Sequence, residues 1–142
     1  MTFFVDANAI LYSAFPGTAR NNCVRVLKAI ADGEAEGRTS PAVLEEVWHV
    51  SKRDFEGRLD SVVGNALTLF TPLLPVTEDA LEHALSMSDS RLDTNDRIHV
   101  GTCVTNEIDT VFTADRAFDG VKGIRRIDPF DAAAVEELLA VA

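Results

Sequence analysis

Short apolar segments alternate with helical ones along the chain, and this order constrains the fold more than any other feature. Strands are predicted at residues 2–5, 38–39, 74–76, 110–113 and 123–127, with helical patterns between most of them. Strands separated by helices pair in parallel and are covered by helices on both faces. The sequence therefore predicts an α/β fold, a three-layer α/β/α sandwich around a mainly parallel sheet of about 4–5 strands.

Several of the helices have recognisable first residues. Ser40 followed by Pro41 is a typical N-cap with proline at the first helical position, and Thr77 and Asp93 are caps for two later helices. After a short helix or turn at 7–14, helices are expected at residues 18–32, 40–53, 59–70, 77–87, 94–106 and 128–140. In the helix at 18–32, three apolar residues at helical spacing are expected to face the core: Val24, Leu27 and Ala31.

The length of the chain, 142 residues, suits a single domain spanning residues 1–142 with a sizeable core. No apolar run approaches the ~18 residues of a membrane span, and the first residues lack the pattern of a signal peptide. We therefore expect a cytoplasmic protein without membrane contact. Cys23 and Cys103 are isolated in the sequence, which favours two small buried apolar side chains over a disulfide or a metal pair.

The net charge of −10, from 23 acidic and 13 basic residues, argues against binding of nucleic acid through a broad basic surface. A nuclease remains compatible with this charge. Acidic residues can gather around a metal ion while a few arginines elsewhere hold phosphate groups.

Two aspartates follow predicted strands. Asp6 comes directly after the strand at 2–5, and Asp115 comes shortly after the strand at 110–113. Ligands of open parallel sheets bind beyond the carboxyl ends of the strands, and both aspartates belong to that edge. Each could instead cap the helix or turn that follows it. Two such residues at one edge favour a functional site.

Two further acids belong to helices that begin at the same edge. Glu46 lies about 100° from the centre of the apolar stripe of its helix and Glu45 about 160° away, so Glu46 should point across the sheet edge and Glu45 into solvent. That stripe consists of Val43, Leu44, Val47 and Val50. Asp96 lies in the first turn of its helix, three residues after Asp93. The alternative for Glu46 is a solvated helix acid, and for Asp96 an interaction with the helix dipole or a capping box.

Four carboxylates that converge in one place repel each other unless protons or cations neutralise them. Divalent ions that prefer oxygen ligands, Mg²⁺ or Mn²⁺, suit such a site. A bound ion of this kind activates water and stabilises charge on a reacting phosphate. The sequence contains no cluster of cysteine and histidine that would suggest zinc.

Five segments resemble the PIN-domain family, in particular the VapC-type toxins of bacterial and archaeal toxin–antitoxin pairs. They lie in the family's order and span nearly the whole chain. The segments are Phe4–Leu11, Ser40–Val47, Asn95–Thr102, Val111–Asp119 and Gly123–Pro129.

The resemblance implies a metal-dependent endoribonuclease that hydrolyses RNA phosphodiesters, often of tRNA or ribosomal RNA. It implies a catalytic quartet of Asp6, Glu46, Asp96 and Asp115, in which Asp6, Asp96 and Asp115 hold Mg²⁺ or Mn²⁺ directly or through water. Glu46 would help to hold the metal or orient the attacking water. It also implies a homodimer, and a small antitoxin protein that inserts into the active-site groove.

Five residues are candidates for accessory roles. Asn8 and Thr113 stand where the family often places polar groups near the metal, and Asp119 is either an extra acid or a turn residue. Arg97 and Arg116 each adjoin a proposed metal ligand, so they either contact phosphate or form surface ion pairs.

Other interpretations stay open at this point. His99 lies one turn after Asp96 and is either a general base or a structural histidine. The chain could also be a non-catalytic module of the same fold that binds RNA or protein. A phosphatase or response-regulator-like domain with one nucleophilic aspartate would need a lysine after a late strand, and Lys122, in an apparent loop, is the only late lysine.

Overall fold

Four parallel strands form one sheet in the order β2-β1-β3-β4. The structure is a computed structural model, and it describes residues 1–88 and 91–141. The strands are β1 (Thr2–Val5), β2 (Glu36–Arg38), β3 (Thr110–Phe112) and β4 (Arg125–Ile127). The helices are α1 (Ala7–Ala14), α2 (Arg20–Ala31), α3 (Pro41–Phe55), α4 (Asp60–Phe70), α5 (Glu78–Ser86), α6 (Thr94–Thr105), the short 3₁₀ helix η1 (Arg116–Phe118) and α7 (Ala132–Val141).

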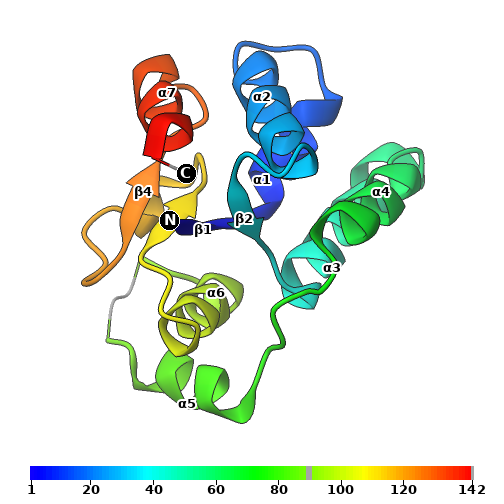
Figure 1. Ribbon diagram of the computed structural model, residues 1–142. Coiled ribbons are helices and arrows are strands. Elements are labelled where there is room, and N and C mark those ends of the chain that lie inside the picture. The colour runs from blue at the N-terminus through cyan, green and yellow to red at the C-terminus, as the bar shows by residue number, and fades with distance from the viewer. Residues whose placement is uncertain (89–90, 142) are drawn as a thin grey trace.

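The helices cover the sheet on both faces. In Figure 1, α1, α2 and α7 lie above the strands and α5 and α6 lie below them, while α3 and α4 stand beside β2. This arrangement confirms the predicted three-layer α/β/α sandwich around a parallel sheet. Within the described residues, no helix is long and apolar enough to cross a membrane.

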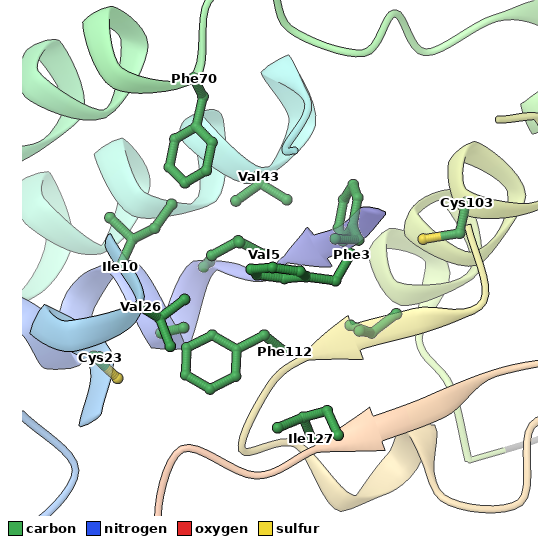
Figure 2. Packing of buried hydrophobic residues seen from close by; sticks show 14 of the residues in the cluster. Phe3, Val5, Ile10, Cys23, Val26, Val43, Phe70, Cys103, Phe112 and Ile127 are labelled. Carbon is green, nitrogen blue, oxygen red and sulfur yellow. The ribbon is translucent and has the colours of Figure 1, made fainter. Parts of the chain in front are cut away.

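The core is built around the two central strands, whose side chains are buried on both faces of the sheet. Phe3, Phe4, Val111 and Phe112 have no solvent exposure. Figure 2 shows how side chains from several helices gather around these strands, with Cys23 and Cys103 at well-separated points. Both cysteines are buried and free, as the sequence predicted.

The strand predicted at 74–76 is wrong. The N–H of Leu74 donates a hydrogen bond to the Thr39 carbonyl oxygen at 2.9 Å, but the segment forms no strand and has no regular structure. Pro72 and Pro75 lack the N–H groups that would continue a ladder, which explains the failure.

Two helix predictions also need correction. In α2 the buried residues are Cys23, Val26 and Ala29, whereas Val24 and Ala31 are exposed, because the apolar spacing fits more than one face of the helix. The last helix begins at Ala132 instead of residue 128.

Helices α5 and α6 pack so closely at Gly101 that there is no room for a larger side chain. A Cβ atom added at Gly101 would lie 2.2 Å from the backbone oxygen of Ala80. We expect Gly101→Ala to lower the free energy of unfolding by about 1–3 kcal/mol, because backbone must move to relieve the overlap. At Gly64, in α4, no atom lies within 4 Å of such a Cβ, and Gly64→Ala should raise stability by about 0.5–1 kcal/mol. Urea unfolding of the two variants measures both effects, and equal losses would contradict the packing argument.

Candidate active site

The carboxyl ends of β1 and β3 lie side by side and bring Asp6 next to Thr113. Val5 pairs with Phe112 in the parallel register, so the residues that follow them are also adjacent. The Thr113 hydroxyl donates to Oδ2 of Asp6 at 2.8 Å. The other carboxylate oxygen of Asp6 accepts the N–H of Ala7 and caps α1. Asp6 is therefore both a helix cap and a buried acid at the predicted edge of the sheet.

Helix α3 begins at the same edge and positions Glu46. Ser40 follows the end of β2, and its side chain accepts the N–H of Val43, so it caps α3 as predicted. Glu46 is half-buried, whereas Glu45 is exposed. The prediction from helix angles that Glu46 is more buried than Glu45 is therefore confirmed.

Helix α6 brings Asp96 to this edge from a different direction. Its cap is Asp93, whose Oδ1 accepts the N–H of Asp96 at 2.8 Å. This bond fixes the first turn of the helix, and Asp96 itself is buried.

The four acids of the proposed quartet line one cleft of about 550 Å³. Asp6, Glu46, Asp96 and Asp115 all line it, together with Asn8. The remaining lining residues are Ala7, Leu11, Ala42, Glu45, His49, Val50, Arg53, Asp93 and Asn95. Carboxylates that are far apart in the sequence thus meet at a single site.

A hydrogen-bond network joins the ends of β1 and β3 behind the cleft. The amide of Asn8 donates to Oγ1 of Thr113 at 2.8 Å and accepts the N–H of Ala114 at 3.0 Å. The N–H of Asp115 also donates to Oγ1 of Thr113, at 3.1 Å. Asn8 and Thr113 therefore fix the positions of Asp6 and Asp115 relative to each other.

His99 is a central member of the site, although the sequence left its role open. It is fully buried, and its Nε2 lies 3.1 Å from Oε1 of Glu46 and 3.8 Å from Oδ1 of Asp6. Its Nδ1 is the buried side-chain nitrogen that has no hydrogen-bond partner among the described residues. The only signal in the sequence was its position one turn after Asp96.

Burial, together with the crowding of acids, raises the pKa of two of the cleft carboxylates. Burial and the charges of Asp6, Asp93 and Asp115 raise the pKa of Asp96 to about 8. Burial also raises the pKa of Asp6, although His99 and the hydrogen bond from Thr113 oppose the shift. Burial lowers the pKa of His99, but the hydrogen bond to Glu46 and the charge of Asp6 outweigh it and leave that pKa raised.

The donor set suits a hard divalent cation. Asp6, Glu46 and His99 each offer a ligand atom, and these atoms lie within 4.8 Å of one another. Asp96 and Asp115 add carboxylates to the same cleft. His99 offers a ring nitrogen, but the other four donors are carboxylates, the ligands that Mg²⁺ and Mn²⁺ prefer. Burial and the neighbouring acids together raise the pKa of Asp96, and a cation would neutralise the charge that both of them disfavour.

The three charged accessory candidates do not line the cleft. Arg97 donates to the carbonyl oxygens of Leu92 and Met87, and Arg116 is exposed outside the cleft. Asp119 binds Arg126 through both oxygens of its carboxylate, at 2.8 and 3.3 Å. Its pKa is lowered by that partner. Asp119 thus anchors Arg126 instead of adding an acid to the cleft.

The comparison of the sequence with known families gives one clear result. The sequence profile of the PIN domain matches residues 3–124. The chain belongs to the PIN domain family. Its relatives include a VapC ribonuclease of Mycobacterium bovis and Ribonuclease VapC13 of Mycobacterium tuberculosis. Each is 24% identical to this PIN protein over 131 residues, which cover 87% of this chain and 97% of the relative.

Solved structures of toxin–antitoxin proteins share the fold. VapBC2 from Rickettsia felis, bound to a DNA fragment from its promoter, matches with a TM-score of 0.70 at 14% identity. A toxin–antitoxin complex from Klebsiella pneumoniae matches with a TM-score of 0.66 at 20% identity. Each comparison covers 90% of this chain and 98% of the other. This PIN domain therefore has the fold of these structures over most of its length.

Proposed function

We propose that this PIN protein is a metal-dependent endoribonuclease and the toxin of a toxin–antitoxin pair. The observation that carries the proposal is the convergence of Asp6, Glu46, Asp96 and Asp115 on one cleft, where the pKa of Asp96 rises to about 8. The names of the mycobacterial relatives support the choice of RNA as substrate. The reaction is hydrolysis of a phosphodiester bond in RNA, with the cytoplasm as the expected compartment.

In the proposed mechanism, Asp6, Asp96 and Asp115 hold Mg²⁺ or Mn²⁺, directly or through water. When bound, such an ion activates water and stabilises the charge that develops on the phosphate. Glu46 helps to hold the ion or orients the attacking water. Thr113 keeps the Asp6 carboxylate in place through its hydroxyl, and the chain supplies no covalent nucleophile.

The partners form part of the same proposal. Structural relatives of this chain are toxin–antitoxin complexes, which supports a small antitoxin as the cognate partner. A homodimer is the expected state of the toxin.

The direct test is cleavage of purified cellular RNA by the metal-free protein after addition of Mg²⁺ or Mn²⁺. We expect defined RNA fragments with either ion and none with excess EDTA. A protein that binds neither ion and leaves RNA intact would instead be a binding module of the same fold.

His99 is expected to act as a positioning residue for Glu46. Replacing it by leucine, in His99→Leu, removes the contact with the Glu46 carboxylate at 3.1 Å. Such a loss beside a metal centre should reduce cleavage and metal affinity about 10–100-fold. His99→Gln keeps an N–H donor at a similar reach and should retain much of both. Cleavage rates and Mn²⁺ calorimetry on the two variants check the idea, and identical behaviour of leucine and glutamine would show that His99 only fills space.

A further inference from the structure

The charges that line the cleft are not evenly distributed. Four of the six lining acids come from the end of β1, the start of α6 and the segment after β3, whereas α3 supplies Arg53 and His49 together with the other two acids, Glu45 and Glu46. Within the described lining, Arg53 is the one arginine or lysine. RNA that reaches the acidic centre therefore meets a fixed positive charge on only one side of the cleft.

The geometry of α3 places this charge at a useful distance from the centre. Glu46, Val50 and Arg53 are spaced four and three residues apart, so they share one face of the helix. At 1.5 Å per residue, Arg53 lies about 10 Å along the helix axis from Glu46. Val50 lies between these two ends of α3, and with Leu11 of α1 it gives the cleft an apolar lining, which suits a sugar or a base better than a phosphate.

The side chain of Arg53 is held by an exposed carboxylate that a phosphate could replace. Its guanidinium donates to both carboxylate oxygens of the neighbouring Asp54, at 3.0 and 2.8 Å. Both side chains are about half exposed, at 59% and 46%. Exposed ion pairs contribute little to stability, and the same two parallel N–H donors match a phosphate.

Other arginines of the chain are engaged away from the cleft. Arg97 binds backbone carbonyls, Arg126 contacts Asp119 and Asp128, and Arg25 pairs with Glu136. Arg53 therefore differs from them in combining a cleft position with an exchangeable partner.

We propose that Arg53, with His49 beside it, binds a backbone phosphate that flanks the phosphate cleaved at the acidic centre. The RNA strand then leaves that centre along α3, over the apolar lining. This inference rests on the proposed nuclease function and adds the path of the substrate. It also accounts for RNA binding by a chain whose net charge is −10: the contact is local and the surface as a whole is not basic.

The test measures RNA binding apart from cleavage. Short fluorescent oligouridylate and oligoadenylate are titrated with the Asp6→Asn protein in Mg²⁺ at several KCl concentrations. Adding the Arg53→Ala substitution should weaken the binding of both oligonucleotides about 5–10-fold near 0.1 M KCl. It should also reduce the slope of log affinity against log salt concentration by about 0.7, the value for one lost contact to single-stranded nucleic acid. Equal losses for both sequences are expected because a phosphate carries no base identity.

Two pairs of variants serve as matched controls. Lys52→Ala removes the same charge from the same turn of α3, but Lys52 binds Asp60 and does not line the cleft, so RNA affinity should stay near that of the parent. Asp54→Asn frees Arg53 and should strengthen binding several-fold. Glu137→Gln frees Arg125, which lies away from the cleft, and should not.

The outcomes separate the two proposals. If the unchanged protein cleaves RNA with metal but Arg53→Ala and Lys52→Ala bind RNA alike, the inference about Arg53 is overturned and the nuclease function stands. A loss confined to one of the two oligonucleotides, or an unchanged salt slope, also overturns it. If the unchanged protein never cleaves RNA with either metal, the proposed function fails and the inference fails with it.

Discussion

Asp6→Asn is expected to abolish metal-dependent RNA cleavage, by about 10³-fold or more, without unfolding the protein. The amide removes a charged proposed metal ligand from the cleft and with it the expected stabilisation of charge on the reacting phosphate. Cleavage of purified RNA in Mg²⁺ or Mn²⁺ measures the loss, and calorimetry of Mn²⁺ binding should show a matching fall in affinity.

The fold should tolerate this substitution because asparagine is as good a helix cap as aspartate. Its carbonyl oxygen can accept the N–H of Ala7, which Asp6 accepts at 2.8 Å. Its amide then faces Thr113, whose hydroxyl loses its present acceptor. That loss opposes the gain from removing a buried charge, so circular dichroism and the unfolding midpoint of the metal-free protein should change little.

Asp131→Asn is the matched control for this experiment. Asp131 also accepts a backbone N–H at the start of a helix, that of Ala134 in α7, and it does not line the cleft. This variant should cleave RNA like the unchanged protein. Full activity in Asp6→Asn would remove Asp6 from the mechanism, whatever the control shows.

Local signals in the sequence were sufficient for much of the site. Ser40, Thr77 and Asp93 were predicted as helix caps, and each accepts the expected backbone N–H. An aspartate at the end of a strand is placed by the strand itself, so Asp6 could be located from the apolar run before it. These features depend on residues close in sequence, which explains why they could be predicted.

Features that depend on packing between distant elements could not be obtained in this way. His99 contacts Glu46, which lies 53 positions away, and nothing near either residue indicates the contact. The orientation of α2 depended on which of several apolar faces meets the sheet, and the sequence favoured the wrong one. The segment at 74–76 had the composition of a strand, but its prolines prevented pairing.

Helical spacing distinguishes the arginine that lines the cleft from the one that does not. Arg97 is adjacent to Asp96 in the chain, but successive helical residues differ by about 100° in direction, and Arg97 turns away from the cleft. Arg53 follows Glu46 by seven residues, which is close to two helical turns, so both lie on one face. For these two arginines, helical spacing from a candidate site residue indicates the cleft neighbour better than adjacency in the sequence does.

Asp96→Asn is expected to stabilise the metal-free protein at pH 8 while it removes activity. The pKa of Asp96 is about 8 in the folded chain, against an ordinary value of 3.8. The folded state therefore binds more protons than the unfolded state between these values, and stability falls as pH rises from about 4 to about 8. The amide has no proton to lose, and after allowance for screening by water in the cleft the gain at pH 8 should be about 2–3 kcal/mol.

Urea unfolding in EDTA at pH 5, 7 and 8 measures this dependence. The unchanged protein should lose stability along the series, and Asp96→Asn should lose less, with a residual slope from the raised pKa values of Asp6 and His99. Glu82→Gln, an exposed change on α5, should leave the slope intact.

Addition of Mn²⁺ provides the complementary measurement. The cation replaces protons in neutralising the carboxylates. It should therefore stabilise the unchanged protein most at pH 8, where protons neutralise Asp96 least and the loss of folding stability is greatest. Asp96→Asn should respond weakly, because the repulsion is already relieved and one ligand is missing. An unchanged protein whose stability is flat between pH 5 and 8, or whose response to Mn²⁺ equals that of Asp96→Asn, would mean that these carboxylates are not crowded enough to require a cation.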